Sequence, residues 1–86
     1  MRRVVVYTGD FCGYCDRAKA LLDRKGVPYE EVRLPSRDPH ARLRLAELTG
    51  GYTIPQIVVG GRPIGGWDQL QALERAGRLD EVLAGE

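Results

Sequence analysis

The order of apolar and polar residues in the first part of the chain predicts a strand followed by a helix. Residues 4–8 are β-branched or aromatic and predict a buried strand, which Gly9 ends. Over residues 13–25 the apolar positions take helical spacing on one face, formed by Cys15, Ala18, Leu21 and Leu22. Gly26 tolerates the positive φ found just after a helix, and Pro28 prevents the helix from resuming.

The next segment predicts a second strand and a second helix. Residues 29–34 form the expected strand. Ser36 or Asp38 is expected to cap the helix, with Pro39 in its first turn, where a missing N–H group costs nothing. The apolar side of this helix is expected to contain Leu43, Leu45 and Leu48. The glycine pair at 50–51 ends it.

The last part of the chain predicts a hairpin and a third helix. Residues 56–59 and 62–64 are the expected strands, joined by a two-residue turn at the glycine pair 60–61. Pro63 cannot donate a hydrogen bond to a neighbouring strand, which favours an edge position. The third helix is marked by Leu70, Leu73 and Ala76, and a last helical turn by Leu79, Val82 and Leu83. Gly77 separates the two.

The predicted order of elements is β-α-β-α-β-β-α. The first strand–helix–strand unit implies a parallel pair joined by a right-handed crossover, whereas the last two strands pair antiparallel. The expected fold is therefore an α/β layer fold with a four-stranded mixed sheet and flanking helices. With 86 residues and no repeat or linker, the chain is expected to form a single domain over residues 1–86.

Composition narrows the classes of function. Thirteen Lys and Arg residues balance 12 Asp and Glu residues, and a net charge of +1 argues against nucleic acid as a partner. No apolar run reaches the roughly 18 residues of a membrane helix, and the start of the chain is too short in apolar residues for a signal peptide. We therefore expect no membrane partner and a cytoplasmic location. In that compartment a close pair of cysteines is more often redox-active or metal-binding than structural.

The two cysteines, Cys12 and Cys15, enclose Gly13 and Tyr14 where the first strand meets the first helix. Cys12 is expected near the helix N-terminus, where free N–H groups and the helix dipole favour a thiolate. Cys15 lies one turn below, more buried, as a second thiol within reach. Zinc normally takes four ligands, and His40 is the only histidine. A structural disulfide over so short a loop would constrain the unfolded chain little.

Two further motifs have an ordinary interpretation beside a functional one. Thr53-Ile54-Pro55-Gln56 either begins an ordinary strand or contains a cis proline. Gly65-Gly66-Trp67-Asp68 precedes the third helix, whose N–H groups could bind a carboxylate while Asp68 pairs with an ammonium group. Such a site suits the neighbouring ammonium and carboxylate groups of an α-amino acid. Taken alone, the motif favours the simpler interpretation, a helix start with a stabilising acid.

Together these motifs resemble the glutaredoxin branch of the thioredoxin-like fold, from Val4 to about Leu83. The resemblance also includes Tyr7-Thr8 and the helical segment 17–22. It implies a thiol–disulfide oxidoreductase with Cys12 as nucleophile and Cys15 as resolving thiol, without a metal. Pro55 would be a cis proline facing the disulfide. The glutathione site that the resemblance implies consists of Tyr14, Arg42, Thr53, Ile54, Pro55, Gly66, Trp67 and Asp68. Arg42 would hold the glycine carboxylate, and Asp68 the ammonium group.

The chain also departs from the family pattern. Gly13 stands where most members with two active cysteines have proline, Gly9 where lysine is common, and Trp67 where a smaller residue is common. Asp10 makes the charge near Cys12 less favourable to a thiolate. We expect a monomer that reduces protein disulfides and glutathione mixed disulfides with glutathione as co-substrate and no tightly bound cofactor. The alternatives are a glutathione-ligated [2Fe–2S] cluster carrier and a redoxin recharged by thioredoxin reductase or another low-molecular-weight thiol.

Overall fold

The computed structural model of the chain describes residues 2–35 and 37–84. The strands in this part of the chain are β1 (Val4–Thr8), β2 (Glu30–Arg33), β3 (Gln56–Val59) and β4 (Arg62–Gly65). The helices are α1 (Gly13–Arg24), α2 (Pro39–Thr49), α3 (Trp67–Arg75) and α4 (Leu79–Ala84). The predicted order of elements is confirmed, with the final helical turn forming α4. None of these helices has the length and apolar character needed to cross a membrane.

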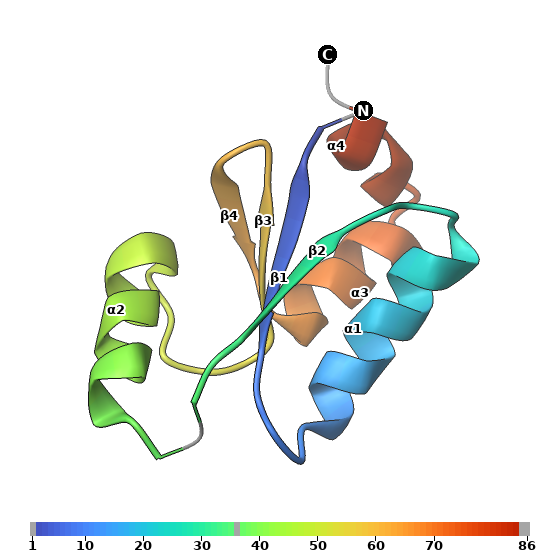
Figure 1. Cartoon of the computed structure of the whole chain (residues 1–86). Coiled ribbons are helices and arrows are strands. Elements are labelled where there is room, and N and C mark those ends of the chain that lie inside the picture. Colours follow the sequence, from blue (N-terminus) through green and yellow to red (C-terminus); the bar gives the residue numbers. More distant parts are fainter. Residues whose placement is uncertain (1, 36, 85–86) are drawn as a thin grey trace.

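The four strands form one mixed sheet in the order β2-β1-β3-β4 (Figure 1). β1 pairs parallel with β2 and antiparallel with β3, and β4 pairs antiparallel with β3. Gly60 and Gly61 form the hairpin turn with φ of 57° and 82°, values that favour glycine. Pro63 lies in β4 at the edge of the sheet, as predicted, a position that tolerates a residue without an N–H group.

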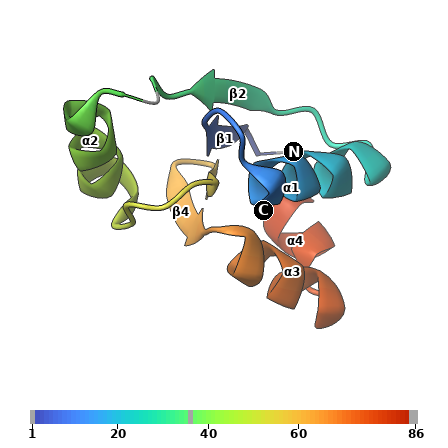
Figure 2. The same cartoon turned by 90° about the horizontal axis from the view of Figure 1, so that it is seen from below.

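Helices cover both faces of the sheet. α1, α3 and α4 lie on one face and α2 on the other, as the two views show (Figures 1 and 2). The first face buries the main core, which comprises Val4, Val6, Ala18, Leu21, Leu22, Val27, Ile57, Val59, Leu70, Leu79 and Leu83. In β1 every second side chain is buried, the pattern of a strand whose side chains alternate between the two faces. The hydrophobic core thereby holds β1 and α1, and with them the loop that joins the two, in a fixed position.

The apolar side of α2 differs from the prediction. Ala41 and Leu45 are each 1% exposed and, being four residues apart, share the face that packs inward. Leu43 is two residues from both, on the opposite side of the helix, and is exposed. Leu48 lies in the last turn and is also exposed. The prediction was wrong for these two leucines because α2 buries only one narrow face.

The helix ends agree with the expected signals. α1 stops at Arg24, and Gly26 follows with φ 70°. Asp38 caps α2 by accepting a hydrogen bond from the His40 N–H at 2.9 Å, with Pro39 as the first helical residue. The other predicted cap, Ser36, lies outside the described residues. β2 is shorter than predicted by one residue at each end.

Candidate active site

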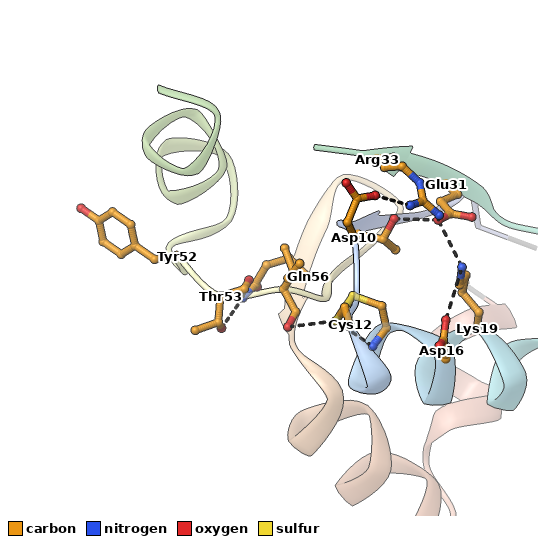
Figure 3. Close-up of a disulfide and its surroundings, with 12 residues drawn as sticks. Asp10, Cys12, Asp16, Lys19, Glu31, Arg33, Tyr52, Thr53 and Gln56 are labelled. Atoms are coloured by element: carbon orange, nitrogen blue, oxygen red, sulfur yellow. Dashed lines mark hydrogen bonds and ion pairs between the residues drawn. A yellow bond between two sulfur atoms is a disulfide. The ribbon is translucent and has the colours of Figure 1, made fainter. Parts of the chain in front are cut away.

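The two cysteines lie at the start of α1 and form a disulfide (Figure 3). Cys12 is the N-cap residue, and its Sγ accepts a hydrogen bond from the Cys15 N–H at 3.1 Å. Cys15 is 1% exposed, whereas Cys12 is half-buried. The structure thus confirms an accessible sulfur at the helix N-terminus with a buried one a turn below it. In the reduced protein this N–H group and the helix dipole stabilise a Cys12 thiolate.

The loop between β1 and α1 brings its backbone close to the start of β3. A Cβ atom at Gly9 would lie 2.6 Å from Cδ1 of Ile54, so the side chain of Ile54 fills the space beside Gly9. Phe11 has φ 53°, the left-handed region that bulky residues rarely adopt, and its side chain is fully exposed immediately before Cys12. The loop is therefore closely packed on one side and open to solvent on the other.

The segment before β3 faces the disulfide. The Ile54–Pro55 peptide bond is cis, as the family resemblance implies. The Ile54 carbonyl oxygen lies 3.8 Å from Cys12 Sγ (Figure 3). Gln56 is buried, and its Nε2 donates to the Thr53 carbonyl oxygen at 2.9 Å. This amide holds the segment in place. We did not predict its role, although a polar residue that opens an apolar strand was a visible signal.

A cavity of about 770 Å³ opens between this segment and the start of α3. Its volume falls within the range typical of small-molecule sites. Seven of the residues assigned to the glutathione site line it: Tyr14, Thr53, Ile54, Pro55, Gly66, Trp67 and Asp68. These residues come from α1, the segment before β3 and the start of α3. The structure thus brings together residues that are more than 50 positions apart in the sequence.

Arg42 is the assigned binding residue that does not line this cavity. Its side chain is exposed on α2, and Nη1 donates a hydrogen bond to the Tyr52 carbonyl oxygen at 2.9 Å. Arg42 therefore supports the backbone just before Thr53. Its expected contact with a carboxylate stays a prediction.

Gln69 lines the cavity and had no role in the sequence prediction. Its Oε1 accepts a hydrogen bond from the Gly66 N–H at 2.8 Å. Glutamine at the third helical position is a known capping signal and could have indicated this contact. Trp67 is half-buried and packs against the main core while it lines the cavity. The backbone of Gly66 also lies close to that of Pro55, because a Cβ at Gly66 would lie 3.0 Å from the Pro55 carbonyl oxygen.

Charged side chains surround the other side of the loop (Figure 3). Glu31 accepts hydrogen bonds from Thr8 Oγ1 at 2.6 Å and from Lys19 Nζ at 3.2 Å. The Thr8 hydrogen bond, followed by that of Lys19, holds the pKa of Glu31 below its ordinary value although partial burial opposes the shift. Asp10 pairs with Arg33 at 2.7 Å. Asp10 is the residue expected to make the charge near Cys12 less favourable to a thiolate, and Arg33 of β2 supplies a cation beside it.

Among residues 2–35 and 37–84, no three His, Cys, Asp or Glu side chains lie close enough together to hold a metal ion. What the site offers within one chain is a pair of sulfur atoms that form and break a disulfide.

The comparisons with known proteins agree with this geometry. The glutaredoxin family model matches residues 4–64. A glutaredoxin from Pseudomonas aeruginosa is 49% identical over 84 residues, which cover 98% of this chain and 99% of that protein. Glutaredoxin 3 from Escherichia coli K12 is 41% identical over 83 residues, covering 96% and 99%.

Solved structures show the same fold. The buckwheat glutaredoxin–glutathione complex matches with a TM-score of 0.85 and 32% identity, covering 96% of this chain and 77% of that one. The holo form of glutaredoxin C1 from Populus tremula x tremuloides matches with a TM-score of 0.86 and 36% identity, covering 94% and 82%. The chain therefore belongs to the glutaredoxin family and is a thiol–disulfide oxidoreductase with the thioredoxin-like fold.

Proposed function

We propose that the enzyme uses glutathione to reduce protein disulfides and glutathione mixed disulfides, with Cys12 as nucleophile and Cys15 as resolving thiol. The position of the disulfide carries the proposal. The half-buried Cys12 Sγ lies 3.8 Å from the Ile54 carbonyl oxygen, and Ile54 lines the cavity of about 770 Å³. A thiol ligand seated in this cavity would therefore have its sulfur next to Cys12.

The chemistry consists of successive thiol–disulfide exchanges. The Cys12 thiolate attacks one sulfur of a protein disulfide, a mixed disulfide forms, and the other substrate sulfur leaves as a thiolate. Cys15 then attacks Cys12 Sγ, which releases the second substrate thiol and forms the Cys12–Cys15 disulfide. One glutathione opens this disulfide by attacking Cys12, and a second removes the first as oxidised glutathione. A glutathionylated protein requires only Cys12, which takes the glutathionyl group and releases the protein thiol.

The cavity offers partners for the sulfur, the cysteinyl amide groups and the γ-glutamyl end of glutathione. We assign the side chain of Tyr14 to the glutathione sulfur and the main chain of Ile54 to the cysteinyl amide groups. The N–H groups of Trp67 and Asp68, at the start of α3, suit the γ-glutamyl carboxylate, and the Asp68 carboxylate suits its ammonium group. The similar buckwheat structure is a complex with glutathione, which supports this assignment. The glycine carboxylate is assigned to Arg42.

Two cysteine variants test the division of roles. Cys12→Ser should abolish both deglutathionylation and the reduction of protein disulfides, because the nucleophile is lost. Cys15→Ser should retain deglutathionylation and lose dithiol reduction of protein disulfides. Equal losses in the two variants would contradict the proposal. Assays with glutathione and its reductase, compared with thioredoxin reductase alone, identify the reductant, and activity with thioredoxin reductase alone would favour the redoxin alternative.

A second candidate role is the transport of a [2Fe–2S] cluster shared between two chains with glutathione. Gly13 favours this role, because glycine stands here in place of the proline of most members with two active cysteines. The space beside it is open, since a Cβ at this position would meet no atom within 4 Å. One of the similar structures is a holo form. Anaerobic reconstitution with iron, sulfide and glutathione should then give visible absorption and a dimer on gel filtration. A colourless monomer after this treatment would exclude the role.

A further inference from the structure

The ion pair between Asp10 and Arg33 lies on the loop that carries Cys12. In the parallel register Thr8 stands beside Arg33, so Arg33 is placed where β1 leads into the loop. Its Nη1 lies 2.7 Å from Asp10 Oδ1, and its Nη2 lies 3.8 Å from Glu31 Oε2. Arg33 is therefore placed between two carboxylates, one of which is only two residues from Cys12 in the sequence (Figure 3).

Two other cations near the start of α1, Lys19 and Arg17, have partners of their own. Lys19 lies 3.2 Å from Glu31 and 3.9 Å from Asp16. Arg17 lies over the ring of Tyr14, 5.4 Å from its centroid. The charged side chains on the elements around Cys12 are Asp16, Arg17, Lys19, Asp23 and Arg24 on α1, Glu30, Glu31 and Arg33 on β2, Asp68, Glu74 and Arg75 on α3, and Asp10 in the loop. Since Gly9 carries no charge, the cation that faces Asp10 comes from β2.

We propose that Arg33 is a positioning residue that keeps Cys12 reactive by neutralising Asp10. An unpaired carboxylate close to a thiolate disfavours the charged sulfur. With Arg33 in place, the hydrogen bond from the Cys15 N–H and the helix dipole act on Cys12 without this opposition. The proposal rests on Cys12 being the nucleophile, as proposed above.

The test measures the reactivity of the Cys12 thiol directly. In a Cys15→Ser background, the rate of alkylation by iodoacetamide against pH gives the pKa of the Cys12 thiol. Arg33→Gln should raise this pKa by about half a unit, the shift for unit charges on the order of 10 Å apart in partly solvated protein. Below the pKa, alkylation should slow by about threefold. In 1 M salt, where the screening length is about 3 Å, most of the shift should disappear.

Three further variants separate charge from shape. Arg33→Lys keeps a cation on β2 without the planar guanidinium, and should leave the pKa of Cys12 near that of the parent. Asp10→Asn combined with Arg33→Gln removes both charges and should return the pKa of the Cys12 thiol to near the parent value. Arg78→Gln is a matched control, because Arg78 is an exposed arginine paired with Glu81 at 3.9 Å beside α4. This control should leave the pKa unchanged.

Each outcome decides the matter. A shift in Arg33→Gln that the double variant reverses supports the proposal. A shift that persists in the double variant, one that Arg33→Lys reproduces, or one no larger than that of Arg78→Gln overturns it. The result is independent of the proposed function, which fails if Cys12→Ser retains glutathione-dependent activity, whatever the pKa of Cys12. Far-UV circular dichroism of each variant checks that the fold is intact.

Discussion

Replacing Thr8 by valine removes one hydrogen bond while nearly preserving the shape of a buried side chain. Thr8 is 1% exposed at the end of β1, and its Oγ1 donates to Glu31 Oε2 at 2.6 Å. This hydrogen bond is the main reason that the pKa of Glu31 lies below its ordinary value. It ties the base of the Cys12 loop to the neighbouring strand. Thr8→Val should therefore destabilise the fold, and the loss should depend on the charge of Glu31.

The structure sets the size of the effect. A hydrogen bond to a charged group contributes about 1.5–3 kcal/mol to stability when it is well shielded. The Glu31 side chain is 30% exposed, so water replaces part of the lost interaction, and Lys19 remains as a partner. We expect a loss of about 1–1.5 kcal/mol at pH 7. In a domain of this size the loss corresponds to a fall in Tm of roughly 5–10 °C.

The dependence on pH follows from the direction of the pKa shift. Because the pKa of Glu31 is lower in the folded than in the unfolded chain, its contribution is complete above the unfolded value of about 4.5. The contribution is lost as the pH falls through the folded pKa. The difference between Thr8→Val and the parent should therefore be present at pH 7 and shrink toward zero in acid, once Glu31 is protonated in both states.

Urea unfolding of the oxidised protein, followed by far-UV circular dichroism at pH 7 and in acid, measures both quantities. Thr8→Ser is the matched control, because it keeps the hydroxyl group and loses a buried methyl group. It should lose similar stability at both pH values. The reasoning is refuted if Thr8→Val is as stable as the parent at pH 7, or if it loses the same free energy in acid.

Two matched pairs of substitutions test the packing around the site. Leu45→Ala should lower the free energy of unfolding by about 2–5 kcal/mol because Leu45 is buried, whereas Leu43→Ala should change it by less than about 0.5 kcal/mol. Equal effects in urea unfolding would contradict the placement of α2. Gly9→Ala should cost about 0.5–1 kcal/mol, since its Cβ would lie 2.6 Å from Cδ1 of Ile54, the end of a side chain that must turn aside. Gly13→Ala meets no atom within 4 Å and should cost nothing in the same experiment; a loss as large as that of Gly9→Ala would refute the argument.

Local signals in the sequence were sufficient for the elements and for the cysteine pair. The N-terminus of a helix lies where the apolar spacing begins, so Cys12 could be placed at the cap from its neighbours alone. Gly26 and the 60–61 pair marked turns because only a few residues tolerate a positive φ. The cis bond before Pro55 was different, because nothing in the local sequence favours it, and only the family resemblance implied it.

The contacts that could not be predicted join residues far apart in the sequence. The pair between Asp10 and Arg33 depends on the register of β1 and β2, and a shift of one residue would turn Arg33 to the other face. Leu43 and Leu48 of α2 were wrongly expected to be buried, because burial of a helix also depends on what the helix packs against. An apolar residue count does not say how wide a face a helix buries, and α2 buries only Ala41 and Leu45.

The two ends of the described chain lie side by side, far from the cysteine pair. The Arg2 N–H donates to the Leu83 carbonyl oxygen at 3.1 Å, and both lie at the end of the sheet opposite the loop that carries Cys12 (Figure 1). A fluorescent protein fused at either end would therefore leave the cavity open. For such a reporter to exchange electrons with Cys12, its linker must reach from this end of the sheet to the other, past the five residues of β1. A strand rises about 3.3 Å per residue, so linkers of fewer than about five extended residues should give a fusion that does not respond.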